Sequence, residues 1–470
     1  MRGLITWMLL LATSWAQPLV PSRETVPVIP REFRGAWAAV IYNIDWPSSS
    51  KLSSAEQQAE MRAILDRMQL LHMNALIFQV RPQCDAVYAS DKEPWSPWLT
   101  GTMGKSPGYD PLEFTIREAR QRGIEVHAWF NPFRALSNAT ATASPQHITR
   151  SAPQLTKKYH NLVWCDPALA ESRQRAMAAI LDVLRRYDVD GIHLDDYFYP
   201  YPQKGQRFPD GLSNEARRRI VDGFMQDLYA QVKRVKPWAR VGISPFGIWQ
   251  PGVPSGTTAS LNAYEDLACD ARKWLQNGWC DYLAPQLYWR IEGPQSYTLL
   301  LDWWRQQGTR PVWPGIASSR IGSSEDPGRK AGEIIDQLQL SRNIGTQRNG
   351  HLHWSVKAIM QNRDQIADQL KALYTAPALV PSMPWLSRTA PLPPTINADR
   401  QGEKITVRWR IQDVSTHKLV VQGRHGTTWQ TIRIATSNSG GIVLPLYDAI
   451  AVTAVNRFGN TAPPTVLRRQ

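Results

Sequence analysis

The strongest constraint on the fold is a repeat of strand and helix that begins at Phe33 and runs through most of the chain. Short apolar runs of strand type alternate eight times with longer amphipathic runs of helical type. Parallel strands joined by helices pair into one sheet, and eight such units are the number that closes the sheet into a barrel. We therefore predict an α/β fold, a (β/α)8 TIM barrel over residues 32–375. The predicted strands are 33–41, 74–81, 124–131, 189–197, 240–246, 281–288, 311–317 and 350–355, and the predicted helices are 56–71, 111–122, 171–187, 214–235, 264–277, 296–307, 331–340 and 357–374.

The pattern changes after residue 375. Residues 376–392 are rich in proline and are predicted to be a linker. Residues 393–466 contain short alternating apolar runs, which predict a small antiparallel all-β sandwich. Because the segment 451–460 is similar to the last strand of fibronectin type III modules, we predict a fibronectin type III-like sandwich. Its expected strands are 404–411, 418–423, 429–435, 441–446 and 450–457.

The first 16 residues have the pattern of an export signal. Arg2 supplies the positive charge, residues 4–12 form a short apolar run, and Ala16 ends a stretch of small residues suited to cleavage. We expect residues 1–16 to be a removed signal peptide and the Pro-rich residues 17–31 to be a linker. The apolar run is too short to cross a bilayer, and no later run is long enough. The sequence therefore predicts export to the periplasm or the extracellular space without a transmembrane segment.

The chain is strongly basic, with a formal net charge of +14. In an exported protein, this charge favours contact with an anionic wall or membrane surface over nucleic acid, for which no binding motif is present. Residues 390–470 alone carry ten Lys and Arg against four Asp and Glu, a net charge of +6. Our hypothesis is that the small domain contacts an anionic wall polymer.

The four cysteines, Cys84, Cys165, Cys269 and Cys280, include no C-x-x-C pair. This argues against a zinc site and against thioredoxin-like redox chemistry. Two structural disulfides and free buried thiols are both compatible with the pattern. If disulfides form, the positions relative to the predicted strands favour Cys84–Cys165 and Cys269–Cys280. No cluster of metal ligands stands out, so neither a metal nor another cofactor is expected.

Polar side chains interrupt the aliphatic pattern at the ends of four predicted strands. Inward positions of a barrel are normally branched and aliphatic, and catalytic groups lie at the carboxyl ends of the strands. Because side chains alternate along a strand, Asp195 and His193 face the same side. Four strands with polar inner faces at one end favour a binding site over separate structural polar groups. These inner-face residues are Gln79, Arg81, His127, Trp129, Asn131, His193, Asp195, Tyr197, Gln286 and Tyr288.

Asp195 is the strongest candidate for chemistry, because a carboxylate buried at a strand end costs free energy unless it is paired or has a function. Asp196 should face the other way unless the strand has begun to turn, so it either catalyses or orients the next loop. Tyr197, Phe198, Tyr199 and Tyr201 follow and offer aromatic faces and hydroxyls that suit a sugar ring, although a packed loop also uses such residues. Glycoside cleavage normally uses a second carboxyl group. The candidates for that group are Asp85, Glu93, Glu265, Asp266 and Asp270.

Six segments, in order along the chain, resemble the bacterial glycosyl-hydrolase-like 10 family. They are Arg34–Trp37, Gly108–Leu112, His127–Arg134, Val189–Tyr199, Gly242–Trp249 and Asp281–Trp289. That family is similar to barrel glycosidases, and its members are associated with cleavage of cell-wall glycans. The resemblance implies a site around Asp195 and Asp196. The residues it implies along the cleft are Trp37, Asn131, Arg134, Gln286, Tyr288 and Trp289.

The resemblance also bears on the second carboxyl group. Residues 264–270 match an acidic stretch of the family, which favours Glu265 and Asp270 among the candidates. Strand 189–197 is similar to the chitinase pattern that ends in Asp-x-Glu. Tyr197 stands in the place of that Glu, so the chitinase mechanism does not carry over.

Together these observations predict a glycoside hydrolase that acts on a wall-type polysaccharide such as peptidoglycan glycan strands. The alternative is a catalytically silent, lectin-like barrel that binds glycan without turnover. A polysaccharide deacetylase is disfavoured because no set of His and Asp metal ligands is visible. The residues leave open the linkage, retention or inversion, and the oligomeric state. The predicted catalytic residues are Asp195, Asp196, Glu265 and Asp270, and the predicted substrate-binding residues are Trp37, Gln79, Arg81, His127, Asn131, Arg134, His193, Tyr197, Tyr199, Gln286, Tyr288 and Trp289.

Overall fold

The computed structural model describes residues 17–203, 206–342 and 348–470, so the predicted signal peptide lies outside the described residues. The chain forms two compact units. One is Ile29–Arg388, and the other joins the described residues 17–28 with Thr389–Gln470. The predicted linker 376–392 is therefore divided between the units. In the first unit, for example, the Ala378 carbonyl accepts a hydrogen bond from Asn74 Nδ2 at 2.9 Å.

The first unit is built on a curled sheet of eight parallel strands, in the order β11-β10-β9-β5-β4-β3-β13-β12. The parallel bridges Leu283↔Val312 and Gln286↔Gly315 connect the two edges of this order, so the sheet curls back on itself. All eight predicted strands are confirmed, with shorter bounds. The strands are β3 (Phe33–Ala38), β4 (Ala75–Arg81), β5 (Glu125–Phe130), β9 (Gly191–Leu194), β10 (Arg240–Ile243), β11 (Tyr282–Leu283), β12 (Gly315–Ile316) and β13 (Gly350–His353).

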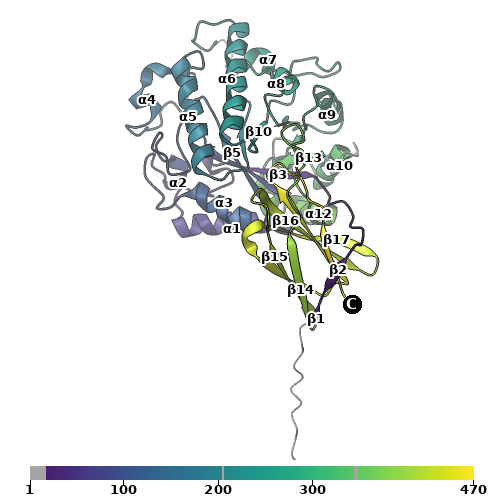
Figure 1. Ribbon diagram of the computed structural model, residues 1–470. Helices are drawn as coiled ribbons and strands as arrows, with labels where there is room; N and C mark the ends of the chain where they lie inside the picture. The colour runs from purple at the N-terminus through teal and green to yellow at the C-terminus, as the bar shows by residue number, and fades with distance from the viewer. Residues whose placement is uncertain (1–16, 204–205, 343–347) are drawn as a thin grey trace, which may run out of the picture. The chain divides into compact units, whose positions relative to one another are not determined.

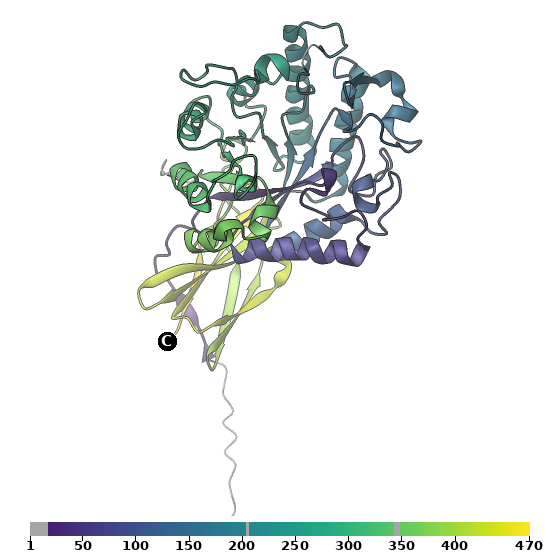
Figure 2. The same cartoon turned by 180° about the vertical axis from the view of Figure 1, so that it is seen from behind.

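Helices follow the strands and lie outside the sheet (Figure 1), as the view from behind also shows (Figure 2). The first is N-capped by a capping box, in which Ser53 and Glu56 satisfy each other's backbone N–H groups. Within the described ranges, no helix has the length and apolar character needed to cross a bilayer. The helices are α1 (Ser54–Leu70), α2 (Pro97–Thr100), α3 (Pro111–Gln121), α4 (Ile148–Ser151), α5 (Ala170–Arg186), α6 (Asn214–Val235), α7 (Ala263–Asp266), α8 (Ala271–Gln276), α9 (Tyr297–Arg305), α10 (Ala331–Arg342), α11 (Val356–Met360) and α12 (Ile366–Leu373).

Two predicted helices are each broken into two pieces. The predicted helix 264–277 is interrupted between α7 and α8, where Ala268 has a φ of 54° and Asp270 N-caps α8. The predicted helix 357–374 is interrupted between α11 and α12, where Asn362 has a φ of 48°. Such left-handed residues cannot continue a right-handed helix. The apolar spacing resumes after each break, which is why periodicity alone did not detect either one.

A small antiparallel sheet that the sequence did not predict lies between β5 and α5. It is made of β6 (Arg134–Leu136), β8 (Leu162–Cys165) and β7 (Thr156–Tyr159), in that order. The segment between β5 and this sheet carries Asn131 and ends at Arg134, two of the predicted cleft residues.

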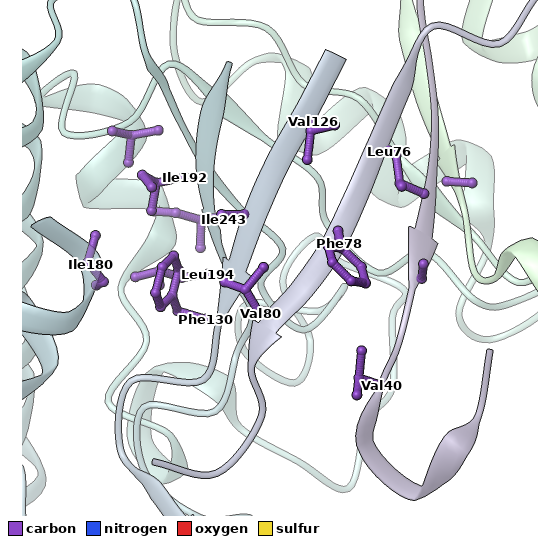
Figure 3. Packing of buried hydrophobic residues seen from close by; sticks show 14 of the residues in the cluster. Val40, Leu76, Phe78, Val80, Val126, Phe130, Ile180, Ile192, Leu194 and Ile243 are labelled. Carbon is purple, nitrogen blue, oxygen red and sulfur yellow. The ribbon is translucent and has the colours of Figure 1, made fainter. Parts of the chain in front are cut away.

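The two faces of the curled sheet carry different cores, as alternation of side chains requires. Outward side chains such as Phe78, Leu194 and Ile243 pack with helix residues such as Ile180 in one large apolar cluster (Figure 3). Inward side chains form a separate cluster of mostly aromatic and small residues. This inner cluster contains Phe33, Trp37, Ile77, Trp129, Tyr282, Trp313 and Leu352, with Trp354 packed against it. Residues in register with the inner cluster therefore face the lumen, which places His193 and Gln79 there.

The second unit consists of two antiparallel sheets around one core. Ile405, Leu419 and Val452 are fully buried between the sheets. The five predicted strands are confirmed, and the all-β architecture with them, while the fibronectin type III likeness stays a prediction. The strands are β1 (Gln17–Pro18), β2 (Val20–Ser22), β14 (Thr395–Gln401), β15 (Lys404–Arg410), β16 (Thr416–His425), β17 (Thr428–Thr436), β18 (Gly441–Pro445), β19 (Ala449–Asn456) and β20 (Thr465–Arg468).

The N-terminal segment 17–31 differs from the linker that we predicted. Its first residues form β1, which pairs with β14, and β2, which pairs with β20. Each sheet of the sandwich therefore receives an edge strand from the opposite end of the sequence. The strands are only two and three residues long and contain proline, so the sequence gives no strand signal there.

Candidate active site

A layer of buried aromatic and polar side chains fills the lumen of the curled sheet. Tyr282 accommodates its ring because Gly242 has no side chain, and an added Cβ would lie 2.0 Å from Tyr282 Cζ. The Tyr282 hydroxyl is 2.9 Å from Nδ1 of both His127 and His193. Trp37 donates from Nε1 to His193 Nε2 at 3.2 Å. Trp37 and His127 are thus both connected to His193, directly and through Tyr282, and all three predicted substrate-binding side chains are buried in this layer.

Asp195 lies above this layer, at the carboxyl end of β9, and is 5% exposed. Its Oδ2 accepts hydrogen bonds from Trp129 Nε1 at 3.2 Å and from Asn131 Nδ2. Its Oδ1 accepts from the Tyr197 backbone N–H at 3.3 Å. Burial raises the pKa of Asp195 to about 7, against the opposing effect of the nearby Arg134 cation. This carboxyl group is therefore poised to exchange a proton near neutral pH.

Asp196 also turns toward the site, because β9 ends at Leu194 and strict alternation ends with it. Its Oδ1 accepts from Gln286 Nε2 at 3.1 Å, and its Oδ2 accepts from the Tyr201 hydroxyl. Burial raises the pKa of Asp196 as well. Because two neighbouring buried carboxyl groups do not ionise independently, the pair favours a state with a single negative charge.

Gln79 positions the donor to Asp195. Its Oε1 accepts from the backbone N–H groups of Val40 at 2.8 Å and Ile41 at 2.9 Å. Its Nε2 donates to Asn131 Oδ1 at 2.7 Å, which directs Asn131 Nδ2 toward Asp195. Gln79 is fully buried, so the structure gives it a positioning role and no direct access to a substrate.

Arg134 and Tyr197 form the polar side of the site. The Arg134 guanidinium carbon lies 4.9 Å from the centre of the Tyr197 ring, and Arg134 Nε donates to the Pro82 carbonyl at 2.9 Å. Burial raises the pKa of Tyr197 above its ordinary range, and the Asp196 carboxylate adds to this effect. The pKa of Tyr288 is also raised by burial and by Asp196, which places both tyrosines beside the carboxyl pair as neutral hydroxyls.

Glu265 and Asp270, which the sequence proposed as catalytic, make local contacts on α7 and at the start of α8. Glu265, on α7, accepts at Oε2 from Nη1 of Arg218, on α6, at 2.6 Å in an ion pair. Asp270 Oδ1 accepts from the Lys273 backbone N–H at 3.2 Å as the N-cap of α8, and from Trp249 Nε1 at 3.3 Å. Both carboxylates are thus occupied by local structural contacts.

Arg81, Tyr199 and Trp289 are also engaged outside the carboxyl pair. A register shift in the β4–β5 pairing between Gln79 and Arg81 interrupts the alternation. Arg81 Nε accordingly donates to Glu93 at 2.7 Å instead of pointing into the lumen. Tyr199 is 1% exposed and packs edge-to-face on Phe208 at 5.5 Å. Trp289 is half-buried against Phe246, with ring centres 5.5 Å apart.

Three residues of the site were absent from the predicted set. Trp129 was assigned to the inner face but not to a role, and Tyr201 reaches back to Asp196 from the following loop. Trp354, half-buried at the end of β13, meets Trp37 at 6.1 Å and Trp129 at 6.0 Å between ring centres. Its inward position follows from alternation with Leu352, a signal that was available in the sequence.

Asp45 holds the segment around Trp354. Its Oδ2 accepts from the Ala39 backbone N–H at 2.9 Å, and its Oδ1 accepts from Lys357 N at 3.1 Å and from the Ser355 hydroxyl. The loop after β3 is thereby fixed to the residues that follow Trp354. Among the residues that the structure describes, no group of three or more His, Cys, Asp or Glu side chains could hold a metal ion.

The chain segment that carries this site matches a known protein family. Residues 32–326, which include β3 to β12 and both aspartates, match the model of the family described as Glycosyl hydrolase-like 10. The chain belongs to the glycosyl hydrolase-like 10 family. This membership supports a glycosidase and implies a carbohydrate substrate.

Two relatives carry the family resemblance over most of their length. The chain is 40% identical over 405 residues to the glycosyl hydrolase YngK of Bacillus subtilis (strain 168), covering 80% of this chain and 79% of that protein. It is 34% identical over 327 residues to the glycosyl hydrolase DigH of Escherichia coli (strain K12), covering 62% of this chain and 74% of that protein. Among solved structures, the endo-1,4-beta-mannanase of Rhizomucor miehei matches with a TM-score of 0.48 and 12% identity, over 76% of this chain and 100% of that chain.

Proposed function

We propose that this protein is a glycoside hydrolase that cleaves a cell-wall polysaccharide, the glycan strands of peptidoglycan, with Asp195 and Asp196 as its catalytic pair. The observation that carries the proposal is the environment of Asp195. It is a buried carboxyl group with a pKa of about 7, oriented by two side-chain N–H donors at one of its oxygens.

Asp195 acts as the general acid. Because Oδ2 already accepts from Trp129 and Asn131, the proton of the neutral carboxyl group lies on Oδ1. From Oδ1 it passes to the glycosidic oxygen as the bond between that oxygen and the anomeric carbon breaks. An elevated pKa keeps the proton available at neutral pH, as general acids of glycosidases require.

Asp196 supplies the negative charge of the pair. Gln286 and Tyr201 hold its two oxygens in place, so its charge is fixed before the substrate arrives. This charge stabilises the positive charge that develops at the anomeric carbon in the oxocarbenium-like transition state. Water then adds to that carbon, its proton returns to the pair, and a new reducing end is released.

The aromatic and cationic groups around the pair suit a wall glycan. Trp354 is half-buried beside Trp129, the direct donor to Asp195, so its ring can stack on a sugar at the point of cleavage. Arg134 is a cation held close to Asp195. Such a cation suits a sugar with an acidic substituent, which the lactyl group of muramic acid provides.

The remaining sequence features support a wall location. The export pattern of residues 1–16 and the net charge of +14 are both expected of a protein that works among anionic wall polymers. We propose that the protein is exported and that the basic sandwich contacts such a polymer. Among β15 residues, Lys404, Arg408 and Arg410 are exposed, which gives this contact a defined surface.

The test is product analysis on a defined substrate. Purified peptidoglycan glycan strands are incubated with the protein, and the products are examined by mass spectrometry and by assay of new reducing ends. We expect shorter strands with free reducing ends from the natural protein and none from Asp195→Asn. Glycan that remains intact but sediments with the natural protein would contradict turnover and would identify a lectin-like barrel instead.

A further inference from the structure

A pair of cysteines lies at the base of the segment that carries Asn131 and Arg134. The Sγ atoms of Cys84 and Cys165 are 3.4 Å apart, and both residues are present as free thiols. They come from the loop after β4 and from the end of β8, and are separated by 81 positions in the sequence. Cys269 and Cys280 are also buried free thiols.

The surroundings of Cys84 differ from those of an inert core thiol. Arg81 Nη2 donates to Cys84 Sγ at 3.1 Å, so the sulfur faces a guanidinium group instead of apolar side chains alone. Glu93 Oε2 accepts from Arg81 Nε at 2.7 Å and partly balances the guanidinium charge. Cys84 also has a φ of 52°, a left-handed conformation that favours glycine and is rarely adopted by other residues. Such an outlier is typical of positions where a side chain has a function.

A cavity has Cys84 in its lining. It has a volume of about 270 Å³, and its lining includes Cys84, Glu93, Lys92 and Arg175. The Lys92 and Arg175 side chains are 41% and 46% exposed, so the cavity meets solvent beside them, whereas Cys84 is a buried residue of its lining. Cys165 is not part of this lining.

We propose that Cys84 and Cys165 are a redox-modification site that takes disulfide-class oxidants. The Cys84 thiolate attacks a sulfur of the oxidant, forming a mixed disulfide and releasing one thiolate of the oxidant. Cys165, after losing its proton to solvent, then attacks Cys84 Sγ, and the second half of the oxidant leaves as a thiolate. The protein loses two protons and two electrons, and one disulfide of the oxidant is reduced to two thiols. The sulfurs move by about 1.4 Å to reach a disulfide bond length of about 2.05 Å.

The cross-link would fix the segment above it. Arg81 Nη1 donates to the carbonyls of Asn131 at 2.7 Å and Pro132 at 3.0 Å, and the Cys165 backbone N–H donates to the Phe133 carbonyl at 2.7 Å. Residues 131–133 are thus connected to Cys84 through Arg81 and to Cys165 through its own backbone N–H. A disulfide closes a long loop of chain, and we therefore expect the oxidised protein to unfold at a higher temperature than the reduced protein.

Mass spectrometry of the full chain tests the site. The natural protein and a Cys269→Ser/Cys280→Ser control are treated, without denaturant, with oxidised glutathione and separately with the smaller disulfide cystamine. We expect both proteins to lose the mass of two hydrogen atoms and to yield a peptide containing Cys84 linked to one containing Cys165. The control also excludes the other two cysteines as the source of the link.

Single variants test the order of attack. Cys165→Ser should accumulate a mixed disulfide on Cys84, because no second thiol resolves it, whereas Cys84→Ser should leave Cys165 unmodified. Melting curves of the oxidised and reduced natural protein check that each sample is folded. Two free thiols at Cys84 and Cys165 after both oxidants, or a mixed disulfide trapped on Cys165 and not on Cys84, would overturn the proposal. Neither result depends on glycan cleavage.

Discussion

Asn131 donates a hydrogen bond from Nδ2 to Oδ2 of Asp195 and receives one from Gln79 on its own Oδ1. Two side-chain amides, Gln79 and Asn131, thereby connect the backbone at Val40 to the carboxyl group at the centre of the site. The arrangement gives Oδ2 of Asp195 two side-chain donors and leaves Oδ1, which accepts only from the Tyr197 backbone N–H, as the oxygen for the proton. It also means that residues with no access to substrate determine how that proton is presented.

The first prediction concerns the charge of Asp195. Asp195→Asn preserves the shape of the side chain and an oxygen that can accept from Trp129 and Asn131, but it removes the transferable proton. We expect kcat to fall by about 1,000-fold or more, equivalent to about 4 kcal/mol of activation free energy. The measurement is reducing-end release at matched concentrations of folded protein, with Asp196→Asn alongside. A well-folded Asp195→Asn that turns over at the natural rate would contradict the assignment.

A matched control separates catalysis from stability. Asp222 is another buried aspartate, and it accepts from Trp274 Nε1 at 2.6 Å and Lys273 Nζ at 2.7 Å. Asp222→Asn should lower the melting temperature while kcat per folded molecule stays near the natural value. Asp195→Asn should show the reverse pattern.

Asp195→Asn also has a predictable effect on the free energy of unfolding. The pKa of Asp195 is about 7 in the folded protein and about 3.9 in an unfolded chain. Because the folded-state pKa is raised, the protonated group favours folding below about pH 4, and this contribution is lost as pH rises through 7. Asp195→Asn should therefore gain stability relative to the natural protein between pH 5 and pH 8. Denaturant melts at both pH values measure this difference, and a constant difference would contradict the raised pKa.

The third prediction concerns the pH dependence of the rate. The Arg134 cation lowers the pKa of Asp195, so Arg134→Gln should raise that pKa further. If Asp195 is the proton donor, the alkaline limb of kcat/KM should move to higher pH, by about one unit or less. Arg134→Lys, which keeps the charge, should shift it little. A limb that stays in place in Arg134→Gln would exclude Asp195 as the group that titrates there.

Much of the fold was predictable because eight apolar runs and their intervening helices are long and periodic. What escaped prediction lacks periodicity. β1 and β2 are too short to show alternation, and the breaks around Ala268 and Asn362 depend on single left-handed residues. Backbone conformation of this kind is set by tertiary contacts, such as the capping of α8 by Asp270.

The placement of the candidate site residues was predictable where alternation holds and was not predictable where it fails. Asp195, Asn131 and Gln79 face the lumen as the period of two requires. The register shift after Gln79 turns Arg81 away from the lumen, toward Glu93. Tyr201 returns to Asp196 through a loop whose path no local pattern describes. Sequence spacing also does not show how deeply an inner residue lies in the lumen. His193 is fully buried, whereas Asp195, at the end of the same strand, is 5% exposed.

Gln79 allows a test of positioning at a distance from the substrate. Gln79→Leu removes the acceptor for Val40 and Ile41 and the donor to Asn131. We expect a loss of about 2–4 kcal/mol of stability from the unpaired N–H groups. Because Asn131 is released, kcat per folded molecule should also fall by about 10-fold or more, with KM little changed.

Gln57→Leu is the matched control for Gln79→Leu. Gln57, in α1, is also buried and donates from Nε2 to the carbonyl of Leu99 in α2 at 2.8 Å. It should lose stability without losing kcat per folded molecule. Equal losses of kcat in both variants would remove the positioning role from Gln79.

The last prediction concerns Trp354 and separates sugar binding from chemistry. The indole meets Trp37 and Trp129 edge-on and remains half-buried, which leaves part of its face available for a sugar ring. Trp354→Ala removes that face, and stacking on an aromatic ring contributes about 1 kcal/mol or more beyond the buried area. We expect KM for long glycan strands to rise by about 10-fold, with a smaller change in kcat, whereas Trp354→Phe keeps an aromatic face and should recover most of the affinity. Initial rates over a range of strand concentrations measure both constants.

As a control for folding, Leu370→Ala creates a cavity in the packed core around α12, away from the carboxyl pair, and should lower the melting temperature without raising KM. If Trp354→Ala binds glycan as tightly as the natural protein does, the sugar lies elsewhere and the indole only fills the lumen.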